Sequence, residues 1–166
     1  MNMKLQLYFY RCKKCDKFFK IPHLTGTGYG EFLMRNKKNE MLYLNAFEDI
    51  AFDEVKIISR RIMTIFNQLN KLNEGEVIQT IFSVACDEGV GANETSYHIG
   101  QKPTCPYCNQ ENVGCWGPTD PPESIEADVK LVTHEHWNTL TEQEKYDAIY
   151  QAIADYFSIE IEAEKI

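Results

Sequence analysis

The stretches Cys12-Lys-Lys-Cys15 and Cys105-Pro-Tyr-Cys108 decide how this chain of 166 residues is organised. Each stretch holds two cysteines with two residues between them, a spacing that lets both sulfur atoms face one point. About ninety positions separate the two pairs. If all four sulfurs meet, the N-terminal segment must lie beside a segment from the second half of the chain.

Four thiolates are the ligand set that Zn²⁺ binds tetrahedrally in closed structural sites. We therefore expect one Zn²⁺ per chain, and its four predicted ligands are Cys12, Cys15, Cys105 and Cys108. Iron, which also accepts tetrahedral sulfur, is the alternative for the same geometry. No other part of the chain indicates an electron-transfer partner, so zinc is the preferred metal.

The residues around both pairs support metal binding. Pro106 can fix φ inside the second turn, and Asn109 tolerates the left-handed conformation just after it. Residues 8–19 and 103–113 resemble the zinc-ribbon modules, with rubredoxin-like knuckles, of bacterial and archaeal proteins. The resemblance implies a metal and a local fold, but no activity. Asp16 and Asn109 stand where these modules commonly have glycine, and the spacer is far longer than the usual 15–20 residues or so.

No family is recognised over the whole chain, so the remaining organisation follows from its length and patterns. A chain of 166 residues is long enough for one domain with a real core. We predict an α+β fold in which a split zinc ribbon, formed by about residues 3–22 and 95–117, surrounds a long α/β insertion at residues 23–94. Residues 118–166 would add a strand and a C-terminal helix to the same domain.

Hydrophobic periodicity places the individual elements. Alternation of apolar and polar residues predicts strands at residues 3–11 and 125–132. Residues 31–35 and 40–46 are expected to form two strands around the polar turn at residues 36–39, and residues 96–100 a short strand. Apolar residues at steps of three and four predict a helix at residues 53–69, capped by Asp53. Residues 77–85 fit either a strand or a buried helix, and we favour the helix. The sequence Thr141-x-x-Glu144 is a capping box and predicts the start of the last helix.

The charge is distributed unevenly. The net charge is −8, yet residues 1–38 hold nine Lys and Arg against two acidic residues, and the rest of the chain holds eight against 23. An acidic majority repels phosphate backbones, which disfavours general nucleic-acid binding. No signal-peptide pattern or membrane-length apolar run is visible, so we expect a cytoplasmic protein with no membrane partner. In that reducing compartment, paired cysteines favour metal binding over disulfides.

The remaining cysteines and histidines give no second site of comparable strength. Cys86 and Cys115 are expected to pack as small apolar side chains. His134 and His136 alternate like ligands on one strand face, but the motif of a hydrolytic zinc site is absent. We interpret them as part of a polar turn before the last helix, and we assign no catalytic residue.

Two classes of function fit these observations best. The first is a non-catalytic protein-interaction module, an acidic inhibitor or immunity-like protein that binds a basic partner. The alternative is a nucleic-acid-binding zinc ribbon, with Lys13, Lys14 and Lys17 beside the aromatic residues Tyr8, Tyr10, Phe18 and Phe19. A metal-dependent enzyme is the third possibility. The sign of the overall charge favours a protein partner, while oligomeric state is left open.

Overall fold

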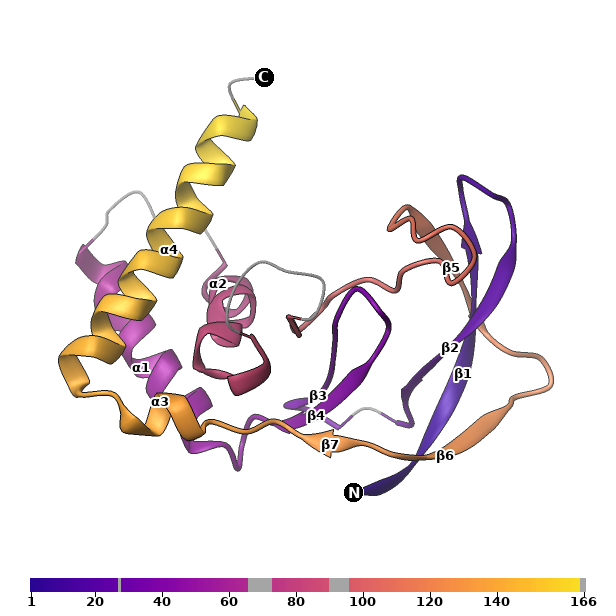
Figure 1. Ribbon diagram of the computed structural model, residues 1–166, viewed down its shortest axis with the longest axis horizontal. Helices are drawn as coiled ribbons and strands as arrows, with labels where there is room; N and C mark the ends of the chain where they lie inside the picture. Colours follow the sequence, from indigo (N-terminus) through magenta and orange to yellow (C-terminus); the bar gives the residue numbers. More distant parts are fainter. Residues whose placement is uncertain (27, 66–72, 90–95, 165–166) are drawn as a thin grey trace.

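The computed structural model describes residues 1–26, 28–65, 73–89 and 96–164, with side chains up to residue 156. Figure 1 shows two β-sheets and a helical layer: the sheet around β1 lies at one end, the β3–β4 hairpin lies in the middle, and α1, α2 and α4 lie at the other end. The predicted α+β class is confirmed. Within the described residues, no helix combines the length and apolar character needed to cross a membrane.

The first sheet is organised around one long strand. β1 (Asn2–Cys12) pairs antiparallel with β2 (Phe18–Leu24) along one edge. Its other edge carries two strands in succession: β5 (Val113–Pro118) beside the second half of β1, and β6 (Ser124–Asp128) beside the first half. Leu7 joins them, because its backbone N–H donates to Glu123 and its carbonyl accepts from Thr119.

The second sheet begins with a tight hairpin. β3 (Glu31–Arg35) and β4 (Met41–Asn45) pair antiparallel, in agreement with the predicted strands. The turn between them is stabilised by Asn36, whose side-chain oxygen accepts from the N–H groups of Lys38 and Glu40, each at 3.0 Å. β7 (Lys130–Leu131) joins β4 in parallel and completes the sheet.

One extended segment connects the two sheets. The single strand predicted at residues 125–132 is divided into β6 and β7, which belong to different sheets. Val129 lies between them and is buried against Leu5 of β1 and Tyr43 of β4. The alternating apolar residues that predicted one strand therefore lie in a segment that passes from the first sheet to the second.

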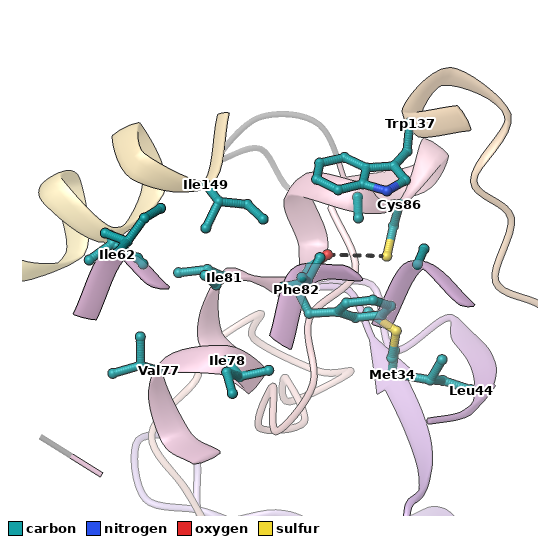
Figure 2. Close-up of a cluster of buried hydrophobic side chains, with 14 of the residues drawn as sticks. Met34, Leu44, Ile62, Val77, Ile78, Ile81, Phe82, Cys86, Trp137 and Ile149 are labelled. Atoms are coloured by element: carbon teal, nitrogen blue, oxygen red, sulfur yellow. Dashed lines mark hydrogen bonds between the residues drawn. The ribbon is translucent and has the colours of Figure 1, made fainter. Parts of the chain in front are cut away.

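The helical layer comprises α1 (Ile50–Ile65), α2 (Glu74–Ile81), the short α3 (Glu135–Thr139) and the long α4 (Glu142–Glu164). Two 3₁₀ turns, η2 (Phe82–Ala85) and η3 (Asp87–Gly89), follow α2. Figure 2 shows the core that they form with the second sheet, in which Phe82 lies near Met34 and Trp137 lies above Cys86. The fully buried side chains of this core include Trp137, Phe82, Met34, Leu42, Leu44, Ile62, Ile149, Ile153, Val55 and Val77.

Helix starts follow side-chain caps, and one prediction was wrong. α1 begins at Ile50 rather than at Asp53, because Asp49 is the residue that accepts a hydrogen bond from the N–H of Phe52, at 2.8 Å. Residues 66–69 of the predicted helix lie outside the described residues. The capping box is confirmed: Thr141 accepts from the N–H of Glu144, whose carboxylate accepts from the N–H of Thr141.

The two remaining predictions have opposite outcomes. The preference for a helix at residues 77–85 is confirmed by α2 and η2. The strand predicted at residues 96–100 was wrong, since only His98 forms an isolated bridge, with Arg35. A sequence pattern five residues long is too short to distinguish a strand from one bridging residue.

His134 links the start of α1 to the segment before α3. Its Nε2 lies 2.8 Å from a carboxylate oxygen of Asp49, and its Nδ1 contacts the carbonyl of Ala85. Burial disfavours the charged imidazole, but the hydrogen bonds to Asp49 and Ala85 outweigh burial and raise the pKa of His134 above its usual 6.5. Both ring nitrogens face acceptors, so the imidazolium is the form that satisfies both.

This arrangement predicts a pH-dependent contribution to stability. A raised folded-state pKa stabilises the fold fully below pH 6.5 or so, and the stabilisation is lost as the pH rises through the folded-state pKa. Replacing His134 by Gln should therefore lower the free energy of unfolding by about 1–3 kcal/mol at pH 6 and by less at pH 8. Denaturant unfolding at both values measures this difference. The exposed His136→Gln is the control, and equal losses at both pH values in His134→Gln would contradict the assignment.

Candidate metal centre

The structure brings the four predicted cysteines together. Their four Sγ atoms all lie within 4.8 Å of one another. The Sγ atoms of Cys12 and Cys108 are 3.5 Å apart, and those of Cys15 and Cys105 are 3.7 Å apart. A disulfide would need about 2.05 Å, whereas sulfurs in a tetrahedral site with metal–sulfur bonds of about 2.3 Å are separated by roughly 3.8 Å. The cluster therefore has the dimensions to hold one metal ion.

Both cysteine pairs lie in turns of the same design. The N–H of Asp16 donates to the carbonyl of Cys12, and the N–H of Asn109 donates to the carbonyl of Cys105, each at 2.9 Å. Asp16 and Asn109 adopt φ of 66° and 58°, the left-handed region favoured by glycine. Two residues that can tolerate this region thus replace the glycine common in zinc-ribbon knuckles. Arg11 also contacts the Asp16 carboxylate, with its Nε at 2.6 Å.

The sheet positions the two turns. The first turn connects β1 to β2, and the second precedes β5, which pairs with β1 up to Cys12. The N–H of Lys13 donates to the carbonyl of Asn112 at 3.0 Å, which ties the two turns together. A small apolar cluster that includes Tyr10, Phe19 and Ile21 packs against the fully buried Cys12 and Cys105.

The electrostatics of the four thiols favour a bound cation. The pKa of Cys12 is lowered, mainly by the hydrogen bond that the backbone N–H of Cys15 donates to its sulfur. The pKa of Cys108 is raised, mainly by burial. Four neighbouring thiols cannot all ionise without a compensating positive charge, because like charges within a few ångströms repel. A metal ion supplies that charge and would deprotonate all four.

The other cysteines and histidines do not join the cluster. Cys86 is buried as predicted, its thiol faces the carbonyl of Phe82 at 3.6 Å, and burial raises its pKa. Cys115, predicted to be packed, is exposed on β5. His134 forms an ion pair with Asp49, whereas His136 is exposed. The two histidines, which alternate in the sequence like metal ligands, therefore do not face a common point. Among the described residues, only the four-cysteine group meets the geometry of a metal site.

The surface around the turns carries aromatic and basic side chains. Phe18, Tyr107 and Trp116 are 49%, 58% and 65% exposed. Arg11 lies 5.8 Å from the ring centre of Phe18 and 6.0 Å from that of Trp116, and Lys17 lies 4.8 Å from that of Tyr107. We call these five residues the knuckle face.

The knuckle face differs from the surface expected from the sequence. Tyr10 and Phe19 were proposed as nucleic-acid contacts, but both are buried behind the metal cluster, and Tyr8 is half-buried. Trp116 and Tyr107, which no sequence pattern singled out, are exposed instead. The position of Tyr107 inside the second cysteine turn was a signal that could have identified it, whereas no neighbouring residue in the sequence indicated the exposure of Trp116.

Comparison with protein-family models, with curated proteins and with solved structures found no match. The functional interpretation of the chain therefore rests on the geometry of the cysteine cluster and of the surfaces around it.

Loss of the cluster should destabilise the whole chain. Replacing Cys105 and Cys108 by Ser removes two ligands, and we expect stoichiometric metal to be lost and the melting temperature to fall sharply. Structural metal sites contribute on the order of 10 kcal/mol in small peptides. Elemental analysis and thermal unfolding measure both effects. Cys115→Ser, which removes an exposed cysteine outside the cluster, should change neither. An unchanged melting transition in the double variant would show that the metal does not hold the fold.

Proposed function

We propose that the protein is a zinc-binding, non-catalytic interaction module. The observation that supports this proposal is the four-cysteine cluster, whose sulfur atoms would occupy all four positions of a tetrahedral metal ion. Catalytic zinc sites keep one position for water or substrate, whereas structural sites are closed. The metal would therefore hold the fold, and the surfaces that it supports would perform the function.

Zinc is preferred over iron because the proposed role needs no change of redox state. Zn²⁺ has no redox chemistry and accepts four thiolates readily, whereas iron in the same geometry serves electron transfer. Iron–thiolate centres absorb visible light and zinc sites do not. Purified protein that is colourless and contains one zinc per chain supports this choice, whereas coloured protein with one iron per chain would reverse it.

The preferred partner is a basic protein that binds the acidic helical layer. α4 contains seven acidic residues and one lysine in its sequence. The lysine, Lys145, contacts Glu54 of α1 at 3.1 Å, so it compensates a carboxylate on the neighbouring helix. Glu142 and Asp147 are exposed, and no ion pair joins either to a cation within the described part of the chain. An acidic surface of this kind speeds association with a basic partner.

Nucleic-acid binding is the second candidate, and the knuckle face is the observation that favours it. Exposed aromatic rings beside Arg11 and Lys17 can stack on unpaired bases while the cations contact phosphates. The exposed Lys13 and Lys14 add positive charge to the same end of the molecule. The acidic helical layer lies at the opposite end in Figure 1, so the two surfaces can be tested separately.

Charge reversal on α4 should weaken binding of a basic partner. Glu142→Lys and Asp147→Lys each remove an exposed carboxylate, and we expect each to reduce capture of the partner from native-host extract several-fold at low salt. Glu126→Lys, the same change on exposed β6, is the matched control. Quantitative pull-down with each purified bait gives the comparison. Equal loss in all three variants would rule out a specific role for α4.

The second candidate makes a different prediction for the same preparation. Binding of an oligothymidylate should quench the fluorescence of Trp116, which is 65% exposed, while Trp137 is 1% exposed and should be insensitive. Affinity should decrease steeply with salt and should fall when Lys13 and Lys17 are changed to Glu. Tight binding that depends on these lysines would replace the proposal of a protein partner. An oligonucleotide without effect would remove the second candidate.

A further inference from the structure

A cavity of about 610 Å³ lies where the two sheets meet. Tyr8 and Tyr10 of β1 and His23 of β2 line one side, and Glu31 and Arg35 of β3 line the other. The segment before the second cysteine turn contributes Lys102. The volume is in the range of small-molecule sites in proteins. None of these residues is a ligand in the four-cysteine cluster.

Arg35 is the unusual residue in this cavity. It is only 4% exposed, and no ion pair joins it to a carboxylate in the described part of the chain. Its Nη2 donates to the carbonyl of Pro22, but its buried Nη1 has no hydrogen-bond partner. A buried charge without a counter-ion is costly, and the cost falls when an anion binds to it.

Aromatic rings form the wall opposite β3. The rings of Tyr8 and His23 have centroids 4.5 Å apart, and those of Tyr10 and His23 are stacked with centroids 5.8 Å apart. The Tyr10 hydroxyl and Nε2 of His23 are 2.8 Å apart, which fixes the orientation of both rings. The Tyr10 and His23 rings are parallel to within 2° and the Tyr8 ring is tilted by 38°, so this wall presents aromatic faces that a ring of the ligand can contact.

The charge of the cavity is positive at neutral pH. Burial, together with the charge of Arg35, lowers the pKa of His23 to about 4, so the imidazole is neutral. Burial lowers the pKa of Arg35 to about 10, which leaves the guanidinium protonated. Arg35 and Lys102 therefore oppose a single carboxylate, Glu31, which already accepts a hydrogen bond from the Tyr43 hydroxyl.

We propose that this cavity binds a small molecule carrying an oxyanion group, a carboxylate or a phosphate, with Arg35 as the principal contact and Lys102 as the second. The Arg35 guanidinium lines the cavity and contacts the oxyanion, and the remainder of the ligand lies against Tyr8 and His23. Arginine suits this position because its planar donors match the oxygens of both groups. This site is independent of the proposed partner surface on α4 and of the knuckle face.

The test uses the imidazole NMR signals of the metal-loaded full chain. Inorganic phosphate and benzoate are titrated separately, with chloride at equal ionic strength as the blank. We expect the His23 signal to shift saturably, while His136, exposed on α3, stays unchanged as the internal control. Whichever probe binds more tightly identifies the preferred oxyanion. Absence of a saturable His23 shift with both probes up to about 50 mM would overturn the proposal.

Two variants test the assigned contacts. Arg35→Gln should weaken binding of the tighter probe at least tenfold or so, the effect of losing a charged hydrogen bond. Lys102 is exposed, so Lys102→Gln should fold normally and reduce affinity several-fold. If Arg35→Gln does not fold, the Lys102 variant decides the question alone. Unchanged affinity in a folded Arg35→Gln, or in Lys102→Gln where only that variant folds, would contradict the site.

Discussion

The meeting of four sulfur atoms from two distant segments is the constraint on which the rest of the structure depends. Cys15 and Cys105 are ninety positions apart in sequence, yet their Sγ atoms are 3.7 Å apart. The entropy of closing a loop increases only slowly with its length, so a long insertion adds little to the cost of bringing the ends together. With both turns fixed, β5 is placed beside β1, and the intervening hairpin and helices must begin and end near the same sheet.

A second contact connects the first sheet to the helical layer. Val129 is buried between Leu5 of the first sheet and Tyr43 of the second, and it lies between β6 and β7 in the same extended segment. The chain then continues through α3, where Trp137 is buried in the main core. The same junction between sheets leaves a cavity lined by Arg35. Packing between the two sheets therefore accounts for the link to the helices. It also leaves a cavity lined by both charged and aromatic side chains.

The sequence was sufficient for the parts that depend on local patterns. The cysteine spacing identified the cluster, alternation identified β1, and the polar turn at residues 36–39 identified β3 and β4. The position of Val129 was not predictable, because alternation does not reveal which sheet each half of a strand will join. Exposure of Trp116 and burial of Arg35 also depend on tertiary packing, since neither side chain has a sequence neighbour that determines its environment.

X-ray absorption at the metal edge of the purified full chain identifies the ligands around the ion and so shows whether the four cysteines bind one metal. We predict four sulfur atoms at about 2.3 Å and no lighter atom in the coordination sphere. Nitrogen or oxygen ligands, or fewer than four sulfurs, would mean that Cys12, Cys15, Cys105 and Cys108 do not close the chain around one metal ion.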